Sequence, residues 1–136
     1  MSETYLKMAE EAFCRAGATD RIELLRGRCL DLLPTLKGDF DLIYIDAAEE
    51  EYKAYTSFIL DNKLLSPDGV ILVDDVLLEG LVLDRSIAQG FPSEIQEPYL
   101  AIADMINDFN AYLASDPRIE VTVLPLFNGI TQIMWK

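Results

Sequence analysis

Apolar residues along the chain form short continuous runs that alternate with segments of helical spacing. The runs from Asp41 to Asp46 and from Val70 to Val73 are almost wholly apolar, which is typical of strands buried on both faces of a sheet. Residues 49–60, which lie between them, carry their apolar side chains at helical intervals. The alternation of strands with helices predicts a layered α/β fold.

Weaker patterns predict the remaining elements. Helices are expected at residues 2–17, capped by Ser2, and from Pro98 onward. Strands are expected at 21–26, 119–124 and 130–135, and turns at 66–69 and 125–129. The sequence shows no repeat and no linker. It therefore predicts one domain, residues 1–136, with a mainly parallel sheet and an antiparallel C-terminal strand.

Composition excludes several classes of function. The chain has 24 acidic and 11 basic residues, for a net charge of −13, which argues against nucleic acid and anionic membrane partners. It has no histidine, which rules out a Ser-His-Asp triad or a histidine zinc site within it. The two cysteines suggest no disulfide framework. Without a signal peptide or an apolar run of membrane-spanning length, a cytoplasmic location is expected.

Acidic residues close the two strongest strands. Asp46 ends the first, and Asp74 with Asp75 ends the second; ligands collect beyond the carboxyl ends of parallel strands. The three carboxylates are either solvated and idle, a site for a divalent cation, or a cluster that shares a proton. Glu49 either begins a helix, where acids favour the helix dipole, or accepts a proton in catalysis.

Four blocks, at residues 16–24, 40–47, 64–77 and 124–131, carry a resemblance to a known family. The second reads Phe-Asp-Leu-Ile-Tyr-Ile-Asp-Ala. In this order the blocks resemble the catechol and caffeoyl-CoA type of S-adenosylmethionine-dependent O-methyltransferase. The resemblance implies a truncated Rossmann-like class I methyltransferase fold. It also implies a divalent cation, usually magnesium, with Asp46, Asp74 and Asp75 at the ligand positions, the third having replaced an asparagine.

The sequence also departs from the family pattern. The family motif Asp-Ala-Asp-Lys reads Asp46-Ala47-Ala48-Glu49 here, so that a cofactor contact and the lysine base are both replaced. Arg28 stands where an acidic residue near the adenine is usual. The glycine-rich turn of the first strands, which would precede Ser2, is absent. From these departures we predict that no cofactor is needed apart from a possible Mg²⁺, and that S-adenosylmethionine is not bound.

These observations lead to one preferred function and two alternatives. The preferred one is a cofactor-independent enzyme of the cyclase, isomerase or dehydratase type. It would act on a small aromatic or polyketide-like secondary metabolite through Asp46, Asp74, Asp75 and Glu49. One alternative is a metal-dependent O-methyltransferase completed by another chain. The other is a non-catalytic pseudoenzyme that serves as a binding module.

Two further expectations concern surfaces. Loss of the missing strands would either bring the strands at 21–26 and 41–46 together or leave an exposed edge on the strand at 41–46. An uncovered edge invites pairing. We therefore expect a homodimer or higher oligomer, with a small molecule as the other partner. The apolar connection at 77–97 is either an insertion that covers the core or a lid over a ligand.

Overall fold

The computed structural model describes residues 3–136. The predicted cap Ser2 lies outside the described residues. The chain forms two compact units, Met1–Leu36 and Lys37–Lys136. No helix in residues 3–136 is both long and apolar enough to cross a membrane.

The first unit is mostly helical. It contains α1 (Glu3–Arg15), α2 (Cys29–Leu32) and the 3-10 helix η1 (Leu33–Thr35). The strand predicted at residues 21–26 is wrong, because this segment is irregular. A strand needs a neighbour to pair with, and here Arg26 instead binds the side chains of Glu3 and Glu10 on α1, at 2.9 and 2.5 Å.

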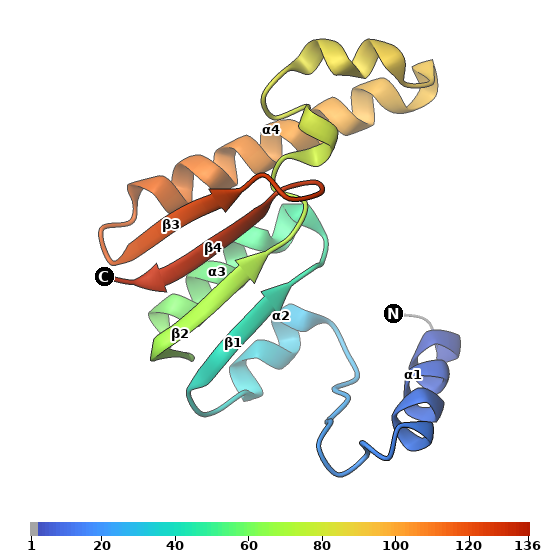
Figure 1. Cartoon of the computed structure of the whole chain (residues 1–136), viewed down its shortest axis with the longest axis vertical. Coiled ribbons are helices and arrows are strands. Elements are labelled where there is room, and N and C mark those ends of the chain that lie inside the picture. The colour runs from blue at the N-terminus through green and yellow to red at the C-terminus, as the bar shows by residue number, and fades with distance from the viewer. Residues whose placement is uncertain (1–2) are drawn as a thin grey trace. The chain divides into compact units, whose positions relative to one another are not determined.

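The second unit is built on a four-stranded sheet in the order β1-β2-β4-β3. The strands are β1 (Phe40–Ile45), β2 (Leu65–Val73), β3 (Ile119–Leu124) and β4 (Ile130–Trp135). β1 pairs parallel with β2, while β4 is antiparallel to both β2 and β3. β1, β2 and β3 therefore run in one direction and only β4 opposes them (Figure 1). The predicted α/β class and the antiparallel last strand are confirmed.

The turn predicted at residues 66–69 lies inside β2, where it forms an irregularity in the pairing with β1. Phe40 pairs with Leu65, and the next pair is Leu42 with Val70. β1 thus advances by two residues (42 − 40) while β2 advances by five (70 − 65). The turn-forming residues bulge out of the ladder, which then continues in register to the ends of both strands.

Two long helices cover one face of this sheet (Figure 1). The helix α3 (Tyr52–Asp61) follows the 3-10 helix η2 (Glu49–Glu51), and α4 spans Ser93–Ser115. The expectation that Pro98 opens the last helix is wrong, since α4 begins at Ser93 and contains Pro98. The core between helices and sheet consists of fully or almost fully buried side chains: Tyr52, Ile59, Leu60, Ile71, Val73, Ile106, Phe109, Leu113 and Ile133.

The opposite face of the sheet is more open in this unit. Alternation along β1 places Leu42 and Tyr44 on this face, where they are 59% and 53% exposed. In the register Tyr44 lies beside Leu72 of β2, and Leu72 lies beside Gln132 of β4. Tyr44 therefore stands on the open face of an edge strand, close to its carboxyl end.

The connection between β2 and α4 is ordered into the 3-10 helices η3 (Leu78–Gly80) and η4 (Arg85–Gly90). Leu78, Leu81 and Ala88 are buried, so the connection covers part of the core. An ion pair between Arg85 and Asp104 joins η4 to α4. A lid role for residues 77–97, and the assignment of the whole chain to one domain, stay predictions.

Candidate functional site

The carboxyl ends of β1 and β2 bring two of the predicted site residues together. Asp46 directly follows the last residue of β1, and Asp74 directly follows the last residue of β2. The backbone amide of Asp74 donates to the carbonyl oxygen of Ile45 over 2.9 Å. Pairing therefore continues past both strand ends and holds Asp46 and Asp74 on neighbouring backbones, at the edge where ligands bind in open α/β sheets.

The carboxylate of Asp74 is held by two donors from the protein. The backbone amide of Asp75 donates to Oδ1 over 2.8 Å. The hydroxyl of Tyr44 donates to Oδ2. Because each oxygen accepts a bond of its own, the direction of this side chain is set by the protein.

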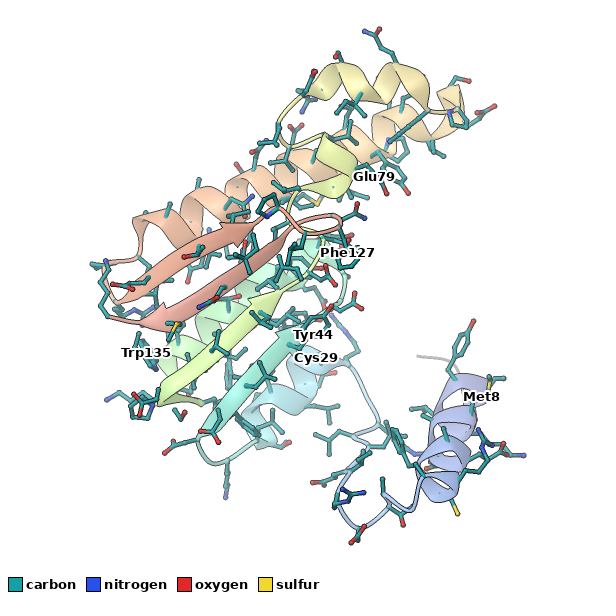
Figure 2. All side chains as sticks on the ribbon, viewed as in Figure 1. Met8, Cys29, Tyr44, Glu79, Phe127 and Trp135 are labelled. Atoms are coloured by element: carbon teal, nitrogen blue, oxygen red, sulfur yellow. The ribbon has the colours of Figure 1, made fainter. Side chains whose placement is uncertain are left out.

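Tyr44 is a site residue that the sequence analysis missed. It precedes Asp46 by two positions, and its register partner Leu72 precedes Asp74 by two positions. Strand alternation therefore puts Tyr44 on the same face as Asp46 and Asp74, and this spacing was the signal available in the sequence. Figure 2 shows Tyr44 towards the carboxyl ends of β1 and β2, with Trp135 at the opposite end of the sheet.

The acidic surroundings keep the Tyr44 phenol protonated. The hydrogen bond to Asp74 is the main cause that raises the pKa of Tyr44 to about 12, and partial desolvation adds to it. The negative charges of Asp74, Asp46 and Asp75 raise the pKa further. All three predicted aspartates thus act on one phenol. Tyr44 is a hydrogen-bond donor at neutral pH, not a base.

Asp75 turns the chain away from the sheet. Its φ of +59° lies in the left-handed region, which aspartate tolerates better than most residues. The next two amides bind the β3–β4 turn: Val76 donates to the carbonyl of Gly129 over 3.2 Å, and Leu77 donates to that of Asn128 over 2.7 Å. The backbone that carries Asp75 is therefore fixed from the C-terminal side.

A buried phenol lies beneath the acidic edge. Tyr52, the first residue of α3, is fully buried and packs edge-on against Phe109 of α4, with ring centroids 5.7 Å apart. Within the described residues its hydroxyl has no hydrogen-bond partner of good geometry. Burial is the main cause that raises the pKa of Tyr52.

Glu49 and two of the predicted aspartates lie close enough to Tyr52 to affect its pKa. The carboxylates of Glu49, Asp75 and Asp46 add to the raised pKa of the phenol, and the backbone of Ala47 opposes the rise. Glu49 is half-buried at the start of η2. It therefore borders the same acidic edge as Asp46 and Asp75, from the side covered by α3.

The predicted cation ligands do not form a ready metal site. Their oxygen atoms are the donors that Mg²⁺ prefers. Among residues 3–136, however, no group of three or more acidic or cysteine side chains is placed to hold a metal ion. Asp46, Asp74 and Asp75 thus have the right chemistry without the right geometry. The magnesium site stays a prediction that would require side-chain movement.

Comparison with known proteins shows the family to which this chain belongs. A family model described as O-methyltransferase matches residues 1–136. The chain belongs to the O-methyltransferase family. Among its relatives, O-methyltransferase hkm8 from Aspergillus hancockii is 64% identical over 152 residues, which cover 100% of this chain and 60% of that protein. The caffeoyl-CoA O-methyltransferase from Populus kitakamiensis is 30% identical over 122 residues, 86% of this chain and 49% of that protein.

A solved methyltransferase structure agrees in fold. The SAH-bound methyltransferase PaMTH1 from Podospora anserina has a TM-score of 0.92 and 38% identity, over 99% of this chain and 58% of that one. The likeness confirms the Rossmann-like methyltransferase fold, and the relatives confirm the resemblance to the catechol and caffeoyl-CoA type. The chain spans about 60% of the length of hkm8 and a similar share of PaMTH1.

The prediction that no cofactor is expected and that S-adenosylmethionine is not bound is wrong. PaMTH1 was crystallised with SAH. The prediction rested on the absence of a glycine-rich turn, but the matched part makes up 58% of PaMTH1. Absence of the turn from these residues therefore says nothing about the complete cofactor site. The comparisons support an O-methyltransferase-like protein and give no support to a cyclase, isomerase or dehydratase.

Proposed function

We propose that this protein takes part in methyl transfer from S-adenosylmethionine to a hydroxyl group of a small aromatic acceptor. Family membership and the likeness to SAH-bound PaMTH1 support the donor. The relative named caffeoyl-CoA O-methyltransferase supports an aromatic acceptor. The observation that carries the proposal is the placement of Asp46 and Asp74 directly after the paired ends of two adjacent parallel strands.

In this reaction the acceptor hydroxyl loses its proton and its oxygen forms a bond to the methyl carbon. The bond between that carbon and the sulfonium sulfur breaks, and SAH leaves with the electron pair. Asp46 and Asp74 suit the acceptor side because carboxylates accept hydrogen bonds from hydroxyl groups and so orient them. Glu49, which borders the same edge, is the proposed proton acceptor.

The described chain is proposed to form the acceptor side of the site. Because it spans 60% of hkm8, the proposal assigns the remaining contacts to the donor to protein outside the matched part. A second candidate is the alternative in which another chain supplies those contacts. It is favoured by one observation: β1 is an edge strand within Lys37–Lys136, with one of its sides available for pairing.

The test is a methyl-transfer assay with S-adenosylmethionine and a catechol, read by mass spectrometry, together with calorimetric titration with SAH. We expect methylated product, and a rate lower by about 100-fold in Glu49→Gln because a proton acceptor is removed. Glu50→Gln is the matched control, since Glu50 is an exposed acid of the same 3-10 helix, and it should keep the wild-type rate.

The outcomes separate the candidates. Product from the protein alone supports the main proposal. Product or SAH binding that arises only when a second polypeptide is added supports completion by another chain. If neither SAH binding nor product is found under any condition, methyl transfer is contradicted and a non-catalytic binding module remains.

A further inference from the structure

Phe127 has the most exposed large apolar side chain among the residues that the structure describes, at 99%. It lies in the turn between β3 and β4, and its φ of +51° is in the left-handed region. A bulky residue seldom adopts this conformation, and residues held in it are concentrated at functional sites. The fold therefore gains no burial from this side chain and strains the backbone that carries it.

The turn that carries Phe127 is bonded to the segment that follows Asp75. The amide of Leu77 donates to the carbonyl oxygen of Asn128 over 2.7 Å. The side-chain amide of Asn128 in turn donates to the carboxylate of Glu79 over 3.4 Å, and Glu79 itself has a φ of +52°. Two strained turns thus support each other, and Phe127 is displayed from backbone that is held by hydrogen bonds.

Phe127 lies at the end of the sheet where the acidic residues gather. β3 runs in the same direction as β2, so the turn after β3 leaves the sheet at the edge where Asp74 follows β2. Figure 2 shows Phe127 at the same end of the sheet as Tyr44, away from Trp135. An apolar ring beside carboxylates suits a ligand that carries hydroxyl groups on an apolar body.

We propose that Phe127 is an acceptor-binding residue, whose ring contacts the aromatic ring of the acceptor while Asp46 and Asp74 orient its hydroxyl groups. The inference rests on the proposed function, because it names one contact of that same site. Offset and edge-on contacts between aromatic rings are favourable. A bound acceptor would also remove from water the apolar surface that Phe127 exposes in the free protein.

Exposed aromatic side chains also occur where two proteins bind each other. A protein interface of ordinary size buries about 800 Å² on each partner. This turn offers two exposed apolar side chains, those of Phe127 and of Leu126, which is 52% exposed. Two side chains can cover one aromatic ring but form only a small part of such an interface, so the size of the turn favours a small ligand.

The experiment is methyl transfer from S-adenosylmethionine to catechol, under the condition, with or without a second polypeptide, in which the wild type forms product. Phe127→Ala should raise the KM for catechol by about three- to tenfold. The kcat and the affinity for SAH should stay unchanged, because only binding of the acceptor is weakened. Phe127→Tyr keeps the ring and should behave as wild type, and Phe127→Leu should lie between the two. Met105→Ala, which changes an exposed apolar residue of α4, is the control and should keep the wild-type KM.

Phe127→Gly separates acceptor binding from folding. Glycine adopts a positive φ without strain, and the side chain that is lost is 99% exposed. The urea midpoint should therefore stay the same or rise, while the KM for catechol rises as it does in Phe127→Ala. A lower urea midpoint in Phe127→Gly would show that the side chain stabilises the fold, and would overturn the inference.

An unchanged KM in Phe127→Ala also overturns the inference, as does a fall in kcat at constant KM. Light scattering tests the alternative occupant: a lower mass in Phe127→Ala than in the wild type would assign the ring to a protein contact. Catechol binding, followed by NMR line broadening, should rank the variants in the same order without depending on catalysis. If the wild type forms product and the variants do not differ, only the role of Phe127 is contradicted. If the wild type forms no product and binds neither SAH nor catechol, the proposed function itself is contradicted.

Discussion

A Cβ atom on Gly129 would lie 2.4 Å from Cγ of Leu77, far inside van der Waals contact. Gly129 also has a φ of +88°, in the region that favours glycine. Its carbonyl accepts the amide of Val76. The β3–β4 turn can therefore approach the backbone after Asp75 only because residue 129 has no side chain.

Gly129→Ala should destabilise the protein by about 2–3 kcal/mol, because the added methyl group meets both an overpacked contact and an unfavourable φ. Urea unfolding at constant m-value measures this change. Gly90→Ala is the control, since a Cβ at Gly90 would meet nothing within 4 Å; it should stay within about 1 kcal/mol of wild type. Equal effects of both changes would contradict the close-approach explanation.

The two buried tyrosines of α3 should respond in opposite ways to loss of the hydroxyl. The Tyr52 hydroxyl has no hydrogen-bond partner of good geometry within the described residues, so Tyr52→Phe should leave stability unchanged or raise it by up to about 1 kcal/mol. The Tyr55 hydroxyl donates to Glu51, so Tyr55→Phe should lower stability by about 1 kcal/mol. Thermal and urea unfolding of the two variants measure these changes in stability. A loss of stability in Tyr52→Phe would contradict the expectation and show that the Tyr52 hydroxyl makes a hydrogen bond in the folded protein.

Acid should weaken the contact between α3 and the segment before β3. Hydrogen bonds from Arg118 are the largest cause that lowers the pKa of both Asp61 and Asp116 below the ordinary 3.8. The pKa of each carboxyl is lower in the folded chain than in the unfolded chain. The hydrogen bonds from Arg118 therefore contribute fully to stability above about pH 4. This contribution is lost as the pH falls through the folded-state values, because the unfolded chain then binds more protons.

Urea midpoints measured from about pH 7 to about pH 2 test this expectation. Arg118→Gln should reduce the loss of stability between about pH 4 and about pH 2. Added salt should reduce the part due to Asp61, because Arg118 and Asp61 are both exposed. Arg21→Gln is the control, since Arg21 and Asp20 are 3.9 Å apart and both are well exposed. A pH profile of Arg118→Gln that coincides with wild type would refute the assignment.

The free edge of β1 leads us to expect that the 136-residue chain by itself associates with a second copy. Leu42 and Tyr44 are exposed beside this edge, and unpaired strand groups invite pairing. Size-exclusion chromatography with light scattering should give a mass above that of the monomer, and Leu42→Lys should shift it towards the monomer. A monomeric wild type at high concentration would count against this expectation.

Strong local patterns were enough to predict much of the fold. The strands at residues 119–124 and 130–135 are found at the predicted positions because apolar runs and a Pro- and Gly-containing turn delimit them. The strand predicted at 21–26 failed because strand formation depends on a neighbour, which a local pattern cannot supply. Proline is common in the first turn of a helix, and for this reason the helix was predicted to begin at Pro98. The helix α4 instead begins at Ser93 and contains Pro98.

Prediction of the site was limited in a different way. Asp46 and Asp74 could be expected at one sheet edge because parallel strands end on the same side. The hydrogen bonds that these two side chains accept could not be predicted from the sequence. They depend on the register between β1 and β2, which decides which side chain of β1 faces Asp74. The spacing of Tyr44 from Asp46 was visible in the sequence, but its bond to Asp74 followed only from the pairing of Tyr44 with Leu72.

Two backbone hydrogen bonds join the segment after β2 to the turn between β3 and β4. They affect how sequence variation in this protein is interpreted. Positions 126–129 lie far from Asp75 in the sequence, yet the backbone that carries Asp75 is bound to two of them. A substitution in this turn is transmitted to the acidic edge through two peptide hydrogen bonds. If the proposed function holds, changes in acceptor preference among variants should therefore be sought in the C-terminal hairpin as readily as at the aspartates themselves.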